Sequence, residues 1–280
     1  MDLFDKLDKT EIKTTDRFPE ADMEFCRQAE KEYHDAYNVY SELSYLIEEI
    51  NDSIQCLSEK TYIQKIDDCK DKVYGCNKKF IRNICGYFKQ KYSVSIDEPD
   101  WKIIKEDKWG YKTKKDKEEA VTLQYILDSV YEQMSGMSFE EKAFHELKED
   151  ARESMTTHQG KSKYCVRGKK LVVDEFYWSH KDYVWGRYTA SIDKKHRSFF
   201  KALTHFEYKR YEISNKYDFL CDYKIDEETG VYDRHYISSS VIEAIKLYKN
   251  GKVEIDFKNN RTAMSFINTY FPGVPQQTAA

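Results

Sequence analysis

Two long runs of apolar residues at heptad-like spacing limit the folds open to this chain more than any other feature. The first run steps by four and three residues and consists of Ala29, Tyr33, Ala36, Tyr40, Leu43, Ile47, Ile50 and Ile54. The second consists of Tyr62, Ile66, Cys69, Val73, Cys76, Phe80, Ile84 and Tyr87. Such spacing places each run on one face of an α-helix. Each face needs an apolar partner, and the nearest in sequence is the other.

We therefore predict a long antiparallel helical hairpin over residues 21–92, with a break near residues 55–60. Ile47 and Phe80 are expected to lie buried between its two helices. The stripes also permit a second copy of the chain as partner, so self-association through this helical arm stays open.

The remainder of the chain mixes helix and strand signals. Helices are expected over residues 117–135, 138–154, 192–210 and 261–271, the last capped by Asn260. Residues 164–173 are typical of a β-hairpin, and strands are expected over residues 241–247 and 253–257. Between these last two strands, Asn250-Gly251 favours a type I′ turn. The order predicts the α+β class, with β-hairpins and short helices in a C-terminal mixed domain. The expected divisions are a tail (1–20), the arm (21–92), the mixed domain (93–273) and a second tail (274–280).

Charge is distributed unevenly along the 280 residues, whose net charge is −4. Residues 1–60 hold 16 acidic and 7 basic side chains, whereas residues 161–210 hold 13 basic and 5 acidic ones. This asymmetry indicates a partner surface on the basic segment or an internal match between the two segments. Seven Cys without a CxxC pair, and no visible signal peptide, favour a reduced, cytoplasmic protein. No apolar run is long enough for a membrane span.

Several motifs of catalysis and cofactor binding are missing. No two of the ten Gly are separated by one residue, which argues against dinucleotide and methyltransferase cofactor loops. Gly160-Lys161-Ser162 lacks the first Gly of a P-loop, and there is no Gly-x-Ser-x-Gly elbow. The seven His are scattered, although His180 with Asp182, or His196 with His205, can meet in space. We expect no cofactor, no metal and no enzyme activity.

One strand pattern keeps a catalytic alternative open. Glu254, Asp256 and Lys258 alternate, as in metal-dependent nucleases, where two carboxylates hold Mg²⁺. The simpler interpretation is the solvated face of a hairpin, with Val253 and its alternate neighbours facing the core.

The basic segment from residue 161 to residue 210 is the best candidate for binding. Cations interleaved with aromatic rings can hold phosphates and stack on bases. The alternative is that the rings belong to the core and the cations are ordinary surface residues. The expected binding residues, for nucleic acid or a protein partner, are Lys161, Lys163, Arg167, Lys169, Lys170, Trp178, Trp185, Arg187, Lys194, Lys195 and Arg197.

The sequence of the predicted C-terminal hairpin is similar to that of a known domain family. Lys246-Leu247-Tyr248-Lys249-Asn250-Gly251, followed by an alternating strand to Phe257, resembles an uncharacterised bacterial domain family. Members of that family sit beside or fused to adenine-N6 DNA methyltransferases on plasmids and phages. A helical N-terminal half and a Phe/Leu-rich helix like residues 198–208 are also similar. Lys252 stands where the family has a second Asn, and no Asn-Pro-Pro-Tyr occurs. The resemblance implies a mobile-element setting without methyltransferase activity.

These observations lead to an expected function as a non-catalytic, mobile-element-encoded binding protein. Its target would be a host or phage protein that processes nucleic acid, which makes a counter-defence inhibitor the first candidate. Direct nucleic-acid binding through the basic segment is the second candidate, and a metal-dependent nuclease is the third. No membrane partner is expected.

Overall fold

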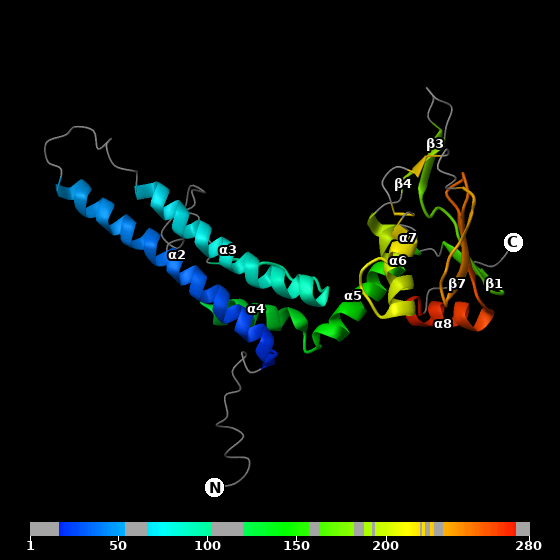
Figure 1. Ribbon diagram of the computed structural model, residues 1–280, viewed down its shortest axis with the longest axis horizontal. Helices are drawn as coiled ribbons and strands as arrows, with labels where there is room; N and C mark the ends of the chain where they lie inside the picture. The colour runs from blue at the N-terminus through cyan, green and yellow to red at the C-terminus, as the bar shows by residue number, and fades with distance from the viewer. Residues whose placement is uncertain are drawn as a thin grey trace, which may run out of the picture. The chain divides into compact units, whose positions relative to one another are not determined.

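The computed structural model describes residues 17–53, 66–101, 120–156, 163–181, 188–191, 194–218, 220–221, 225–226 and 232–272 (Figure 1). The chain divides into two compact units, residues 1–140 and 141–280, and each is considered by itself. The first unit is helical, and the second combines helices with an antiparallel five-stranded sheet. The predicted α+β class is therefore confirmed.

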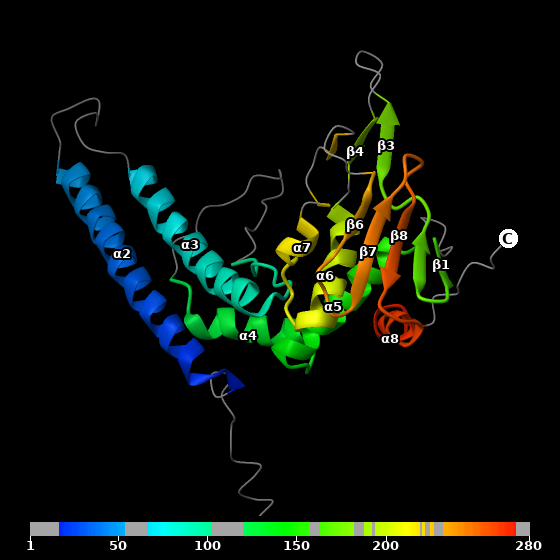
Figure 2. The same cartoon turned by 45° about the vertical axis from the view of Figure 1, so that its right-hand side comes forward.

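Two long helices make up most of the first unit. Helix α2 (Glu20–Ser53) begins directly after Pro19, and helix α3 (Ile66–Tyr92) lies beside it (Figures 1 and 2). The connection, with the break predicted near residues 55–60, lies outside the described residues.

Side-chain contacts give the relative direction of these helices. Tyr33 on α2 stacks on Phe80, with ring centroids 4.5 Å apart, and its hydroxyl donates to Asn77 Oδ1 at 2.6 Å. Nearer the start of α2, Phe25 stacks on Tyr87 with centroids 3.9 Å apart. Rising residue numbers on α2 meet falling numbers on α3, so the two helices run antiparallel.

The predicted apolar stripe on α2 is buried only in part. Ile47 and Phe80 are buried, as predicted. Leu43 and Ile50 were expected in the same seam, but they are 37% and 44% exposed, so this part of the prediction is wrong. An α-helix has 3.6 residues per turn, so residues at heptad spacing drift around its axis. The buried face of α2 is turned toward Tyr37 and Ser44, which are half-buried beside Ile47, and away from Leu43 and Ile50.

A third helix of the first unit lies among the described residues. Helix α4 (Leu123–Met134) begins after Thr122, whose side chain caps the first turn. Just before it, the Val121 amide donates to the Tyr33 hydroxyl at 2.9 Å. The compact first unit therefore contains α4 in addition to the two long helices, and it continues to residue 140.

The second unit holds two antiparallel sheets. Five strands pair in the order β1-β2-β8-β7-β6 and three in the order β3-β4-β5. The strands of the larger sheet are β1 (Tyr164–Arg167), β2 (Lys170–Val173), β6 (Arg234–Tyr236), β7 (Ile242–Leu247) and β8 (Val253–Phe257). The other elements are α5 (Phe139–Ser154), β3 (Trp178–Lys181), β4 (Tyr188–Ser191), α6 (Lys194–Tyr208), α7 (Asn215–Asp218), β5 (Ile225–Asp226) and α8 (Asn260–Tyr270). The predicted hairpin over residues 164–173 is confirmed as β1 and β2.

Helices cover one face of the five-stranded sheet, and no helix among the described residues of this unit lies on the other, which we call the open face (Figure 2). Phe199 on α6 contacts Phe266 on α8 edge to face, with centroids 5.7 Å apart, and Phe266 also packs on Phe257. Alternate strand residues such as Leu171 and Ile255 join this buried core. Because side chains alternate along a strand, the residues between them project from the opposite face.

The hairpin between β7 and β8 uses a different turn from the predicted type I′. Gly251 has φ +82, but Asn250 does not have a positive φ, and type I′ needs positive φ at both central residues. The Gly251 amide donates to the Tyr248 carbonyl and the Tyr248 amide to the Lys252 carbonyl, both at 2.9 Å. This is a three-residue loop with a type I turn and a glycine bulge.

The last helix begins one residue earlier than predicted. Asn259, not Asn260, is the cap, and its Oδ1 accepts a hydrogen bond from the Thr262 amide at 2.8 Å. Two consecutive Asn can each cap a helix, and backbone geometry selects the one with extended φ and ψ. The helix ends before Pro272.

Candidate functional site

The open face of the five-stranded sheet brings together several charged and aromatic side chains that could bind a ligand. In one row across the sheet, Lys170 lies between Arg167 and Asp256. In the next row, Lys246 lies between Glu254 and Arg234. We define the outer sheet face by Arg167, Lys170, Arg234, Tyr236, Lys246, Tyr248, Lys252, Glu254 and Asp256.

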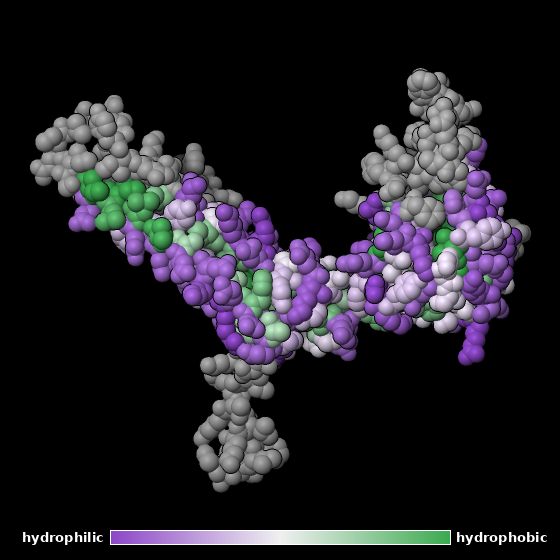
Figure 3. Space-filling view, viewed as in Figure 1, coloured by the Kyte–Doolittle hydropathy of each residue, from purple (hydrophilic) through white to green (hydrophobic). Residues whose placement is uncertain are grey.

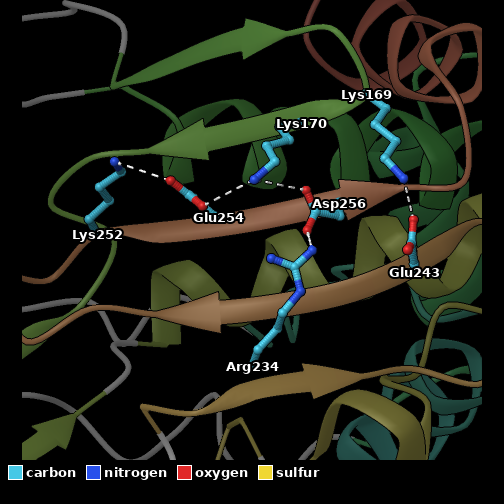
Figure 4. Close-up of polar contacts among 7 residues, drawn as sticks. All are labelled: Lys169, Lys170, Arg234, Glu243, Lys252, Glu254 and Asp256. Atoms are coloured by element: carbon cyan, nitrogen blue, oxygen red, sulfur yellow. Dashed lines mark hydrogen bonds and ion pairs between the residues drawn. The ribbon is translucent and has the colours of Figure 1, made fainter.

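An ion-pair network at the centre of this face fixes several of its cations (Figure 4). Asp256 is buried, with an exposed fraction of 2%, and it accepts a hydrogen bond from Arg234. Lys170 Nζ lies 3.6 Å from Asp256 Oδ1 and 3.7 Å from Glu254 Oε2. Lys252 Nζ lies 3.3 Å from Glu254 Oε1. Two carboxylates thus hold three cations in defined positions across three strands and the β7–β8 loop.

The surroundings of Glu254 favour its ionised form. Burial alone would raise its pKa, but hydrogen bonds from Tyr248 and Lys252, and the charge of Lys170, outweigh burial and lower the pKa. Outside the central network, Lys169 in the β1–β2 turn pairs with Glu243 on β7 (Figure 4).

Tyrosine rings lie between the cations of this face. The Arg234 guanidinium lies 5.8 Å from the ring centroid of Tyr236. The ammonium groups of Lys246 and Lys252 lie 5.1 and 5.2 Å from the ring of Tyr248. Tyr236 is 75% exposed, so its ring is available to a ligand. A pocket of about 470 Å³ opens beside it, and its lining includes Arg234 and Tyr236.

The charge balance of the outer sheet face is positive. Five Lys and Arg side chains face two carboxylates, which leaves a net charge of +3 on one sheet surface. The whole second unit carries 24 basic and 20 acidic side chains, whereas the first carries 22 and 30. A polyanion would therefore be attracted to the second unit and repelled by the first.

The nuclease-like strand places its two carboxylates, Glu254 and Asp256, in contact with cations of neighbouring segments. Val253 and the alternate residues after it are buried, as the simpler interpretation predicted. Glu254 and Asp256 share the other face, but the prediction of a solvated face is wrong for Asp256, which is buried under Arg234 and Lys170. Within the described part of the chain, no three His, Cys, Asp or Glu side chains are grouped to hold a metal ion.

Histidine pairs suggested by the sequence have other neighbours in the structure. The His196 ring lies 4.8 Å from Phe176, and His205 Nδ1 lies 2.6 Å from the Tyr270 hydroxyl. Burial, followed by the charge of Lys209, lowers the pKa of His205. Both rings therefore contact residues of the hydrophobic core. Asp182, the suggested partner of His180, lies outside the described residues.

The structure brings only part of the predicted basic segment together. Arg167, Lys169 and Lys170 lie on or next to the outer sheet face. Lys163 Nζ instead reaches the Glu175 carbonyl at 3.5 Å, and Arg197 donates to the Cys221 carbonyl at 2.6 Å. Lys161, Trp185 and Arg187 lie outside the described residues. For Trp178 at the start of β3, and for Lys194 and Lys195 at the start of α6, only the backbone is described.

Sequence reasoning missed the second half of the outer sheet face. Arg234, Tyr236, Lys246, Tyr248 and Lys252 lie more than 60 residues after Lys170. Their alternating cation and ring pattern was visible in the sequence. The sequence did not show that this pattern lies on the same surface as Lys170, because that follows from the pairing of β2 with β8.

Comparison of the chain with protein-family models, curated proteins and solved structures found no match. Among the described helices, none has both the length and the apolar character that a membrane crossing requires.

Proposed function

We propose that this chain is a non-catalytic binding protein whose outer sheet face binds single-stranded nucleic acid. The observation that carries the proposal is the juxtaposition of five cations with the rings of Tyr236 and Tyr248 on one open sheet surface. Cations attract the phosphates, and exposed rings stack on unpaired bases, which is how sequence-tolerant single-strand binders work.

A single strand fits this face better than a duplex. Reading duplex DNA requires an element that enters a groove, usually a helix or a two-stranded ribbon. The outer sheet face is a surface of several strands, and its most exposed ring, Tyr236, needs an unstacked base as its partner. The carboxylates Glu254 and Asp256 hold Lys170, Arg234 and Lys252 in place rather than a metal, which supports binding over cleavage.

The experiment measures the affinity of the full chain for a fluorescent oligothymidylate by anisotropy over a range of salt concentrations. If about four phosphates are neutralised, the slope of log affinity against log salt is about −3. The double variant Arg167→Glu/Lys246→Glu should reduce the magnitude of this slope by about 1–2. Tyr236→Ala should weaken binding about tenfold through lost stacking.

The single variant Arg167→Glu has a matched control in Lys201→Glu, which makes the same charge change on an exposed residue of α6, away from the sheet face. Equal losses for Lys201→Glu and Arg167→Glu would show that net charge alone governs binding. Absence of binding at low salt would reject the proposal. Cleavage of the oligonucleotide with Mg²⁺ or Mn²⁺, abolished by Asp256→Ala, would instead establish the nuclease alternative.

A second candidate function is protein binding by the first unit, whose net charge of −8 repels nucleic acid. In the mobile-element setting that the resemblance implies, such a protein would be a counter-defence inhibitor of nucleic-acid-processing machinery. A pull-down from host lysate with and without nuclease treatment distinguishes the candidates. Protein partners that survive nuclease favour inhibition, and nucleic acid recovered alone favours direct binding.

A further inference from the structure

Helix α2 exposes a second apolar column beside the one that packs on α3. Val39, Leu43, Leu46 and Ile50 follow one another in steps of four, three and four. Their exposed fractions are 61%, 37%, 53% and 44%. They contribute to the apolar surface that is visible along the C-terminal half of α2 (Figure 3). This spacing is that of the a and d positions of a coiled-coil seam.

An acidic column borders the same seam. Asp35, Glu42 and Glu49 are spaced by seven residues, and all three are exposed. Glu42 and Glu49 each precede a seam residue at an a position, which places the column at the g positions. Side chains at g flank the seam and face the e or g positions of a docked helix.

A second copy of this chain would be a poor occupant of the seam. In an antiparallel pair the g column meets itself, so Glu42 and Glu49 would oppose other carboxylates. In a parallel pair the g column meets the e positions, here Tyr40 and Ile47. Ile47 is only 3% exposed because it packs toward α3, and neither residue carries a cation. Neither arrangement neutralises the acidic column.

We propose that the exposed seam of α2 binds an amphipathic helix of a partner protein that carries Lys or Arg beside its own apolar heptad positions. Apolar residues at heptad spacing would fill the seam between Val39 and Ile50, and the flanking cations would pair with Asp35, Glu42 and Glu49. This proposal rests on the second candidate function, protein binding, and is independent of the outer sheet face.

The test uses two synthetic helical peptides as probes with the full chain. Both have Leu at their a and d positions, and one has Lys at every e and g position whereas the other has Glu. Isothermal titration should show binding of the Lys peptide at least about tenfold tighter than that of the Glu peptide. Leu46→Glu should abolish binding of the Lys peptide without changing the far-UV circular dichroism, because Leu46 is half exposed.

Charge-reversal variants test the acidic column. Glu42→Lys should weaken binding of the Lys peptide about tenfold and strengthen binding of the Glu peptide. Asp71→Lys makes the same charge change on an exposed residue of α3 and should leave both affinities within about twofold.

Three results would overturn the proposal: no binding of the Lys peptide, equal binding of both peptides, or a dimer of the chain that Leu46→Glu dissociates. The oligothymidylate measurement with Leu46→Glu separates this failure from failure of the nucleic-acid proposal, since that variant should bind the oligonucleotide normally.

Discussion

At the tip of the β7–β8 hairpin, Gly251 packs too closely against the chain for any other residue. Its carbonyl accepts hydrogen bonds from the amides of Phe176 and Tyr177, at 2.8 and 3.3 Å. A Cβ built on Gly251 would lie 2.6 Å from the Tyr177 carbonyl oxygen, and φ is +82. The hairpin that supplies Lys246, Tyr248 and Lys252 to the outer sheet face is therefore held at its turn by backbone contacts.

Gly168, in the β1–β2 turn, offers a matched comparison. Its φ is +60, but a Cβ there meets nothing within 4 Å. Gly168→Ala should cost about 1 kcal/mol from the left-handed backbone alone. Gly251→Ala should cost about 2–4 kcal/mol, because the backbone clash adds to the same strain. Urea unfolding measures both variants, and equal losses would contradict the close approach at Gly251.

At the scale of helices, a buried carboxylate joins the start of α2 to the end of α3. Asp22 is fully buried and accepts hydrogen bonds from the hydroxyls of Tyr87 at 2.7 Å and Tyr92 at 2.5 Å, and from Lys91. Burial opposes its ionisation, but these hydrogen bonds and the Lys91 charge outweigh burial and lower its pKa. Burial, followed by the hydrogen bond to Asp22 and the charge of Asp22, raises the pKa of Tyr92 to about 12.

Asp22→Asn should destabilise the chain by about 2–3 kcal/mol at neutral pH, because hydrogen bonds to a buried charge are lost. The pKa of Asp22 is lower in the folded than in the unfolded chain, so this stability is complete above the ordinary Asp pKa. It disappears as pH falls through the lower folded pKa. Urea unfolding at several pH values should show wild type and variant converging in acid. Asp71→Asn, at an exposed position of α3, is the control, and an equal loss there would refute the role of the Asp22 network.

At the scale of the whole molecule, the two proposed binding surfaces lie on units of opposite net charge. The first unit has a net charge of −8 and carries the exposed seam of α2. The second has a net charge of +4 and carries the outer sheet face. Each surface therefore attracts a ligand whose charge the other unit repels.

Hydrogen exchange of the full chain should separate the two surfaces in one experiment. Oligothymidylate should protect peptides from β2, β6 and β8 and leave α2 unchanged. The Lys-flanked peptide should protect α2 and leave the sheet unchanged. Protection of α2 by the oligonucleotide would contradict the assignment of nucleic-acid binding to the second unit.

Local pattern in the sequence was enough to predict the α+β class, the β1–β2 hairpin and the burial of Ile47 and Phe80. Periodicity and turn residues act within a few positions of one another, so a sequence displays them directly. The turn type at Gly251 and the cap at Asn259 depended on backbone dihedral angles, which residue preferences only bias.

Tertiary structure alone decided which faces are covered and which segments meet. Heptad spacing placed Leu43 and Ile50 with Ile47, but the way α2 is turned in the fold buries the side of Ile47 that carries Tyr37 and Ser44 instead. Likewise, Lys170 meets Asp256 only because β2 pairs with β8, a contact between residues 86 positions apart that no local pattern encodes. Burial and strand pairing depend on the competition of all segments for one core, whereas helices, strands and turns follow from neighbouring residues.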